Sequence, residues 1–260
     1  MDEQIKVEEV IKFWDNNPLC ASVIPYALGT KEYFNYYDKL RELNGSIDFH
    51  EKLHEYRDFA GKKVLDVGSG NGYVLSHYAK AGAEVFGIDL SQTAIDLCRK
   101  RFEIAGLKGN FQVANAENMP FDDETFDCVC SMGVLHHTPD TKQAISEVYR
   151  VMKKNGRLIL MFYHKNSALY WVGIHLQAII KMKSIRQLIN EVDGVGNPKG
   201  AVYTKKNLRQ LLVRFNNLNI FVGLLQGWMI MPGLGRFLPD SWLKSLAGRY
   251  GWFLYAKGYK

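Results

Sequence analysis

Cysteine is scarce in this chain of 260 residues, which contains four. Cys20, Cys98, Cys128 and Cys130 are too few and too scattered for the disulfide framework of a small secreted protein. Cys128 and Cys130 are two positions apart on an expected core strand, so both side chains point to one face of the sheet. We expect them to pack as small apolar residues, and we expect no metal site.

Long hydrophobic runs are also missing. The longest apolar stretch, residues 168–180, would span about 20 Å as a helix and contains His175 and Gln177. A membrane crossing needs about 20 apolar residues, so the sequence predicts no transmembrane helix. Met1 to Gln4 are acidic and carry no apolar h-region, so we expect no secretory signal and a cytoplasmic location. Peripheral contact with a membrane surface stays open.

Blocks of positive charge are absent as well. The 33 Lys and Arg residues outnumber the 27 Asp and Glu residues and give a formal net charge of +6, but they are dispersed along the chain. Mild basicity of this kind is usually a solvated surface, so nucleic acid is not the expected partner. The length and the ordinary composition suit one α/β domain with additions.

Glycine, by contrast, is concentrated after an apolar run. Residues 64–72 read Val-Leu-Asp-Val-Gly-Ser-Gly-Asn-Gly, and residues 86–90 read Phe-Gly-Ile-Asp-Leu. The first run is typical of a buried parallel strand, and the second closes on Asp89, 17 residues after Gly72. A strand, a glycine loop, a helix and a second strand that ends in an acid are a common way to hold an adenosine. Backbone amides face the ligand, and the acid binds the ribose hydroxyls.

The same stretch distinguishes between adenosine ligands. A dinucleotide site of the G-x-G-x-x-G type needs a third glycine where this chain has Tyr73. Asp66 would also lie near the two negative charges of a pyrophosphate. S-adenosyl-L-methionine (SAM) has no phosphate and carries a sulfonium and an ammonium group, which suit an acid beside the loop. A glycine-rich turn without a ligand is the plain alternative.

Residues 64–72 resemble the first motif of class I SAM-dependent methyltransferases, and residues 86–91 resemble the second. The resemblance continues through residues 115–121 and 133–137 and is close over about residues 61–165. The chain is similar to the group with a methyltransferase type 11 domain, which includes ubiquinone-type and other small-molecule methyltransferases. This resemblance implies SAM as the cofactor, S-adenosyl-L-homocysteine (SAH) as the product, and a Rossmann-like sheet of seven mostly parallel strands with helices on both faces.

The resemblance also implies which residues hold SAM. The glycine loop would wrap the methionine part, Asp89 would bind the ribose, and residues 115–117 would bind the adenine. Asn115 departs from the family, which commonly has Asp there, although an amide oxygen can also accept a hydrogen bond from the adenine amino group. The predicted cofactor-binding residues are Asp66, Gly68, Ser69, Gly70, Gly72, Asp89, Leu90, Asn115, Ala116, Glu117 and Ser131.

Apolar spacing and capping residues predict the helices. A helix over residues 5–14 ends before Pro18, and a helix that Ser91 caps ends at Gly106. Asp140 caps a third, and Asn155-Gly156 is an expected turn before the next strand. Residues 167–189 predict one long helix that is apolar on most sides. Such a helix is either buried or covers a hydrophobic partner.

The expected strands complete a three-part chain. Beyond the two strands around the glycine loop, strands are expected at residues 110–114, 126–131, 158–163, 219–225 and 252–256, and the resemblance implies that the last is antiparallel. Residues 1–60 form a helical cap, residues 61–163 the SAM-binding core, and residues 164–260 a lid helix with the remaining strands. Tyr33, Phe34, Tyr36 and Tyr37 either pack the cap onto the core or close part of it over the methyl donor.

Methyl transfer from a sulfonium is a one-step displacement, so alignment and exclusion of water supply most of the catalysis. A general base is needed only when the acceptor is protonated. The candidates are His136 and His137, just past the fourth strand, and His164, just past the fifth, where doubly wound sheets bind ligands. Each could equally be structural.

The expected acceptor is a small molecule, apolar or aromatic, given the aromatic cap and the apolar lid. The sequence does not identify the methylated atom, which could be oxygen, nitrogen or carbon, nor the oligomeric state. A nucleic-acid methyltransferase is one alternative, but the N/D-P-P-Y/F motif of amino-methylating enzymes is replaced here by residues 131–134, Ser-Met-Gly-Val. A SAM-binding module without catalysis is the other.

Overall fold

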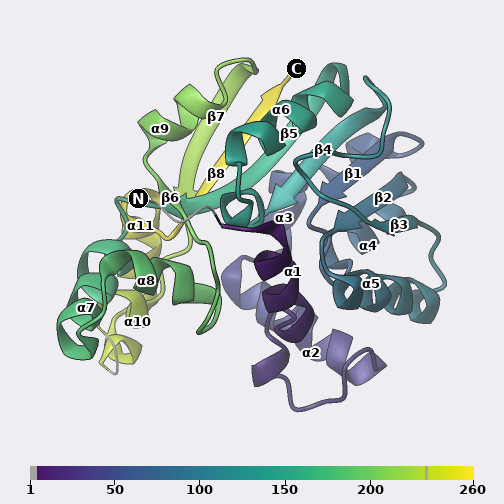
Figure 1. Cartoon of the computed structure of the whole chain (residues 1–260). Coiled ribbons are helices and arrows are strands. Elements are labelled where there is room, and N and C mark those ends of the chain that lie inside the picture. Colours follow the sequence, from purple (N-terminus) through teal and green to yellow (C-terminus); the bar gives the residue numbers. More distant parts are fainter. Residues whose placement is uncertain (1–4, 232–233) are drawn as a thin grey trace.

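The computed structural model describes residues 5–231 and 234–260, and its centre is one β-sheet (Figure 1). The strand order is β3-β2-β1-β4-β5-β8-β7, and a short β6 pairs with β5. The strands are β1 (Lys63–Val67), β2 (Glu84–Asp89), β3 (Asn110–Val113), β4 (Phe126–Met132), β5 (Met152–His164), β6 (Val202–Tyr203), β7 (Asn216–Gly223) and β8 (Phe253–Tyr259). The predicted α/β class and mostly parallel sheet are confirmed, and β6 adds an eighth strand.

Helices cover both faces of the sheet. Apolar side chains of α4 (Tyr73–Lys80) and α5 (Gln92–Ala105) belong to one core cluster, and those of α6 (Thr141–Val151) and α9 (Lys205–Leu211) belong to a second. Because both faces are covered, four of the five residues of β1 are buried, as expected of a central parallel strand. β8 runs antiparallel between β5 and β7, which confirms the expectation for the last strand.

The predicted caps and the cysteine packing are confirmed. The Ser91 side chain accepts from the backbone of the first turn of α5, and Gly106 ends that helix with a φ of +65°. Asp140 accepts from two backbone amides of α6. Cys128 and Cys130 are both buried in the same apolar cluster, and no cluster of potential metal ligands occurs in residues 5–231 or 234–260.

The N-terminal cap packs over the edge of the sheet where the parallel strands end. Asp15 accepts from the Ser91 hydroxyl at 2.7 Å and from the Thr93 backbone amide at 3.3 Å, which fixes the first helix over the start of α5. Tyr33 and Tyr37 belong to a core cluster and also line the cavity described below, so the aromatic residues of the cap serve both packing and the cavity wall. The cap elements are α1 (Val7–Asn16), η1 (Ala21–Val23), α2 (Lys31–Asn44), α3 (Ile47–His54) and η2 (Tyr56–Phe59). Met1 to Gln4, which carry the prediction about a secretory signal, lie outside the described residues.

The prediction of one long helix over residues 167–189 is wrong. The chain forms a π-helical segment η4 (Leu169–Ile174) that continues into α7 (His175–Lys181) and then breaks. Met182 adopts a left-handed conformation with a φ of +51°, and Ser184 starts a new helix, α8 (Ile185–Asn190), by accepting from the Gln187 amide. A local capping signal therefore overrides the continuous apolar pattern.

The apolar side chains of this region are buried in part, as Leu169 and Ile174 are, and others are exposed. Ile179 and Met182 are 77% and 93% exposed. No helix in the described part of the chain is long and apolar enough to cross a membrane. The other elements of this region are η5 (Glu191–Asp193), α10 (Gly227–Ile230), η6 (Gly235–Phe237) and α11 (Asp240–Tyr250).

The expected turn at Asn155-Gly156 is instead part of β5. Asn155 has a φ of +60°, so the backbone does bend there. The bend is absorbed within the strand, because the pairing of β5 with β4 changes register between Phe126 and Cys128. The strand therefore begins at Met152, directly after α6.

Candidate active site

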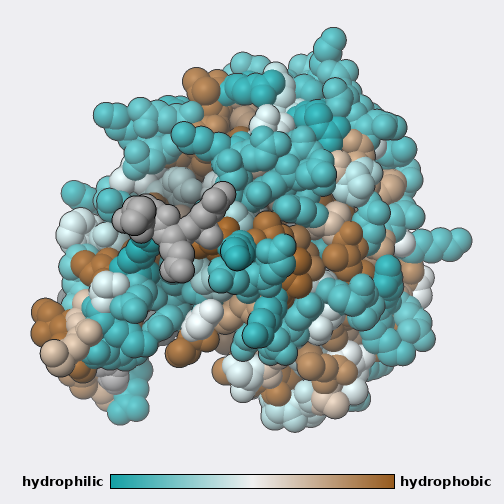
Figure 2. Space-filling model, viewed as in Figure 1, coloured by the Kyte–Doolittle hydropathy of each residue, from teal (hydrophilic) through white to brown (hydrophobic). Residues whose placement is uncertain are grey.

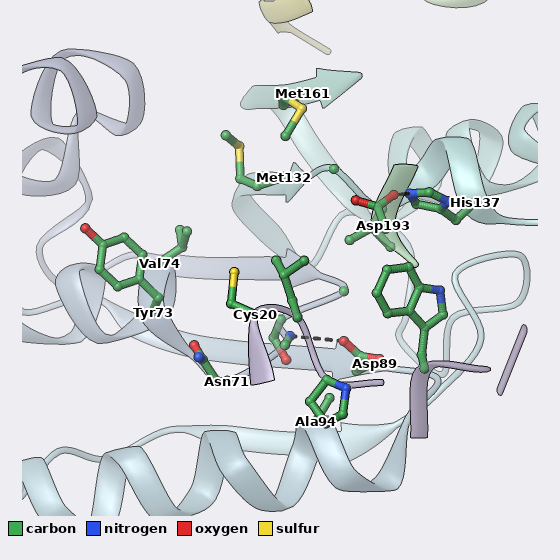
Figure 3. Close-up of a pocket in the computed structure, with 18 of the residues that line it drawn as sticks. Cys20, Asn71, Tyr73, Val74, Asp89, Ala94, Met132, His137, Met161 and Asp193 are labelled. Carbon is green, nitrogen blue, oxygen red and sulfur yellow. Dashed lines mark hydrogen bonds and ion pairs between the residues drawn. The ribbon is translucent and has the colours of Figure 1, made fainter. Parts of the chain in front are cut away.

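A cavity of about 350 Å³ lies at the carboxyl ends of β1, β2, β4 and β5, between the N-terminal cap and the lid (Figure 3). This is the edge at which doubly wound sheets bind ligands. Side chains from all three parts of the chain line it, for example Tyr37 of the cap, Asp89 of the core and Asp193 of the lid. The cap and the lid are therefore both needed to form the site.

The glycine loop after β1 forms one wall of the cavity. Gly68 has a φ of +78°, and a Cβ there would lie 2.3 Å from Val134 Cγ2, so this position requires glycine. Gly70 has open space where a Cβ would be, which leaves its backbone accessible from the cavity. Ser69 lines the cavity between them, as predicted.

Gly72 has a different role from the predicted contact with SAM. It lies outside the cavity lining, and a Cβ on it would lie 2.6 Å from Cys98 Sγ of α5. It directly precedes α4 and has a φ of +76°, a conformation that favours glycine. The third glycine of the motif thus allows α4 and α5 to pack closely.

Asp89 and Leu90 line the cavity beside the loop. The Gly70 backbone amide donates to Asp89 Oδ2 at 3.0 Å, and the Ser91 amide donates to Oδ1 at 3.0 Å (Figure 3). These two bonds fix the carboxylate in one orientation. Each oxygen keeps a lone pair with which it can accept a further hydrogen bond.

Asp66 lies at the end of β1 and lines the cavity with 3% of its surface exposed. Burial and the neighbouring Asp89 carboxylate raise the pKa of Asp66 to about 7. Its Oδ1 has no hydrogen-bond partner among the described residues. A buried carboxyl group of this kind is ready to receive a cation, which would stabilise the ionised form.

Of the residues predicted to bind adenine, Ala116 lines the cavity. Asn115 and Glu117 lie outside its lining and hold the loop instead: Asn115 Oδ1 accepts from the Glu117 amide at 2.9 Å, and Glu117 Oε1 accepts from the Asp140 amide at 2.6 Å. Ser131 also lies outside, because its hydroxyl donates to the Val67 carbonyl at 2.8 Å and ties β4 to β1. Their effect on SAM would be indirect.

The structure separates the three candidate histidines. His136 is fully buried behind the cavity wall, and its ring centroid lies 4.1 Å from that of Tyr163. His164 is buried below the site with its Nδ1 3.0 Å from the Gly251 carbonyl, and burial lowers its pKa. Only His137, among these three, lines the cavity.

The two ring nitrogens of His137 face different neighbours. Nδ1 contacts the Lys199 carbonyl oxygen, which can only accept, so this nitrogen carries a proton. Nε2 lies 3.2 Å from Asp193 Oδ2 (Figure 3). Nε2 is buried against Asp193 without a hydrogen bond to any described residue, and it can donate to this acid only when the ring carries a proton on both nitrogens.

Asp193 is a site residue that the sequence did not reveal. It lines the cavity from η5, and the Tyr163 hydroxyl donates to its Oδ1 at 2.6 Å. Burial and the neighbouring Asp193 raise the pKa of Tyr163 well above its usual range, so the tyrosine remains the donor. No local signal could have found Asp193, because it reaches His137 and Tyr163 only through the tertiary fold.

Arg41 is the second missed residue. It lines the cavity from α2, its guanidinium lies 5.5 Å from the Tyr73 ring centroid, and its Nε is buried with no hydrogen-bond partner in the described part of the chain. A helical signal was present: Tyr33, Tyr37, Arg41 and Asn44 follow an i, i+4, i+8, i+11 spacing, and all line the cavity.

A family model described as a methyltransferase domain matches residues 65–160, the segment that holds the glycine loop, Asp89 and β4. The chain carries a class I SAM-dependent methyltransferase domain. The segment and the site agree, because the loop and the acid that face the cavity lie within the matched residues.

Known methyltransferases are similar to the core of this chain. A phthiotriol/phenolphthiotriol dimycocerosates methyltransferase of Mycobacterium tuberculosis is 33% identical over 155 residues, which are 58% of this chain and 57% of that protein. A ubiquinone biosynthesis O-methyltransferase of Coxiella burnetii is 34% identical over 110 residues, 42% of this chain and 47% of the relative. The chain thus spans about half the length of the curated relatives it matches.

The fold is also found in solved structures. A SAM-dependent methyltransferase from Methanosarcina mazei superposes with a TM-score of 0.56 at 24% identity, over 80% of this chain and 96% of the other. At this identity the likeness supports the Rossmann-like methyltransferase fold.

Proposed function

We propose that the chain transfers the methyl group of SAM to a small, largely apolar acceptor. One observation carries this proposal: the cavity has a glycine loop flanked by an unpartnered acid and an unpartnered base, Asp66 and Arg41, and an apolar region on its other side. The first part fits the zwitterionic end of SAM. The second part fits an acceptor with few polar groups.

The charges in the cavity suit the methionine part of SAM. The α-ammonium group would lie at Asp66, whose buried carboxyl group has an oxygen without a partner. The α-carboxylate would lie at Arg41, whose Nε is likewise unpartnered. The ribose hydroxyls would donate to Asp89, which two backbone amides already orient. The adenine would lie against Leu90 and Ala116.

The acceptor would lie where the core meets the lid. Met132 and Met161 project into this side of the cavity (Figure 3). The apolar side chains that surround it are Met132, Met161, Leu169, Leu224, Met229, Trp252 and Phe253. These residues exclude water and hold the acceptor in line with the transferred methyl group, and such orientation can lower a barrier by ~7–11 kcal/mol.

We propose that Asp193, which lines the cavity from the lid, takes the proton of a protonated acceptor. The Tyr163 hydroxyl donates to Oδ1, and His137 Nε2 lies 3.2 Å from Oδ2, so each oxygen keeps a lone pair. His137 then acts by positioning Asp193. The roles first predicted for His136 and His164 have less geometric support, because both rings lie outside the cavity lining.

Titration calorimetry with SAH and NAD tests the proposed cofactor. SAH should bind to one site per chain, and more tightly than NAD, because a pyrophosphate would meet Asp66 and the ring of Tyr73 near the loop. Tighter binding of NAD would overturn the proposal. No observation on the described residues favours a nucleic acid as the methyl acceptor. The cytoplasmic location of the protein stays a prediction.

The affinity for SAH should depend on pH through Asp66. The free carboxyl group has a pKa of about 7, and the SAH ammonium group favours its ionised form, so binding at lower pH must displace a proton. Affinity should therefore fall as the pH drops below about 7, by up to about tenfold per unit. It should also fall above about pH 9, where the α-ammonium group of SAH loses its proton, because the α-carboxylate beside it raises that pKa above the value of a peptide N-terminus.

Asp66→Asn checks this assignment. The variant should bind SAH more weakly at pH 7.5 or so and should lose the acidic decrease in affinity. An acidic decrease that persists unchanged in Asp66→Asn would show that another group binds the ammonium.

A further inference from the structure

We infer that the lid end of the molecule is a docking surface for an anionic lipid bilayer. This docking end consists of residues 169–190, 226–231 and 234–250, which form η4, α7, α8, α10, η6 and α11 (Figure 1). The use that we assign to this surface, access to an apolar acceptor, rests on the proposed function. Membrane binding itself can be measured without turnover.

Large apolar side chains project from the docking end into solvent. Figure 2 shows apolar atoms at the tip of this end of the molecule. Ile179, Ile180 and Met182 are 77%, 70% and 93% exposed, and Phe237 is 70% exposed. Exposed apolar side chains of this size cost solubility and are typical of a surface that inserts shallowly into the headgroup region.

Tryptophan is concentrated here as well. Three of the five tryptophans of the chain lie in the docking end, and all three are exposed: Trp171 by 57%, Trp228 by 50% and Trp242 by 65%. Tryptophan favours the boundary between lipid and water, because its ring is apolar and its N–H still finds a polar partner.

The charge of the docking end complements an anionic membrane. It contains six basic residues and one acid, whereas the whole chain has 33 basic residues and 27 acids. The basic residues are Lys181, Lys183, Arg186, Arg236, Lys244 and Arg249, and the acid is Asp240. Lys183 is paired with Glu191, but the end as a whole stays strongly positive. Basic residues next to exposed apolar ones are the composition of membrane-surface helices.

The docking end is continuous with the acceptor side of the cavity. Trp228 lines the cavity and is also half exposed, so it lies at the boundary between the two. Its helix, α10, contacts η4, which carries both Leu169 of the cavity lining and exposed Trp171. An apolar acceptor that resides in a membrane could thus reach the cavity without crossing water.

Two other occupants fit less well. A second copy of the chain would bring two strongly positive ends together, which is unfavourable. A nucleic acid would suit the charge but not the exposed Ile179, Ile180 and Met182, which have no partner on a phosphate backbone. The bilayer satisfies both features.

Vesicle co-sedimentation of the full chain tests the inference. The wild type should bind vesicles of phosphatidylcholine with about 30 mol % phosphatidylglycerol more tightly than phosphatidylcholine alone. Binding should weaken between about 0.1 M and about 1 M salt, because the Debye length falls from about 10 Å to about 3 Å. The triple variant Ile179→Ser, Ile180→Ser, Met182→Ser should bind the anionic vesicles about tenfold or more weakly.

A matched control removes three exposed apolar residues elsewhere. Ile104→Ser, Val113→Ser, Val213→Ser changes side chains that are 41%, 45% and 77% exposed, and it should bind vesicles like the wild type. Both triple variants should bind SAH normally, which shows that they are folded. Failure of the wild type to bind SAH would contradict the proposed function and leave the docking result standing.

Four outcomes would overturn the inference. In the first, the wild type shows no preference for anionic vesicles. In the second, both triple variants bind those vesicles equally well. In the third, light scattering would find a dimer that the Ile179, Ile180, Met182 variant converts to monomer, so the surface is a self-interface. In the fourth, a short duplex of DNA or RNA would displace the protein from vesicles through this surface, which would make it a nucleic-acid site.

Discussion

Asp193→Asn should lower kcat by ~10²–10⁴-fold with SAH affinity nearly intact, if the acceptor must lose a proton. An amide cannot take that proton, yet it has the shape of the carboxylate and still accepts from Tyr163 through its oxygen. The loss should therefore appear in the chemical step and not in cofactor binding. Single-turnover kinetics with saturating SAM measures it.

Two variants separate chemistry from structure here. Asp240→Asn removes an exposed acid of the same lid and should leave kcat unchanged. His137→Gln should cost less than Asp193→Asn, because it removes a residue that positions the acid and keeps the acid itself. If Asp193→Asn costs less than about fivefold, alignment alone supplies the catalysis.

Arg41→Met should weaken SAH by roughly 10- to 150-fold, which is ~1.5–3 kcal/mol for a hydrogen bond to a charged group. Methionine keeps most of the apolar contact with Tyr73 while removing the cation. 5′-Methylthioadenosine has neither the carboxylate nor the ammonium group of SAH, so its affinity should stay within about twofold of the wild-type value. Calorimetry with the two ligands gives the comparison.

Arg57→Met is the matched control, because the Arg57 side chain is 89% exposed and should contribute to neither ligand. Equal weakening of both ligands by Arg41→Met would mean that the cap has shifted. Unchanged SAH affinity, together with a raised KM for the acceptor, would assign Arg41 to the acceptor instead.

The cofactor side of the site was predictable because its signals are local. A glycine with a positive φ must follow β1 whatever surrounds it, and Gly68 shows the reason in its contact with Val134. Asp89 ends β2, and its bond to Gly70 follows from the pairing of two adjacent parallel strands. The motif spacing carries this geometry with it.

The acceptor side was not predictable from local patterns. Asp193 borders a glycine-rich loop with no periodicity, and its neighbours come from distant parts of the chain, since His137 follows β4 and Tyr163 lies near the end of β5. Gly72 shows that a motif position need not line the cavity, because glycine is required there for the close packing of two helices. The broken lid was readable, however: Ser184 and Gln187 form a capping box within the apolar run.

The most direct test of the account is transfer of a labelled methyl group from SAM to a pool of small apolar molecules, such as a total lipid extract. The account predicts label in the organic-soluble fraction, with one SAH released per methyl group transferred. Asp193→Asn should abolish most of it. Tight SAH binding with no transfer to this pool, and with label appearing in nucleic acid instead, would contradict the account.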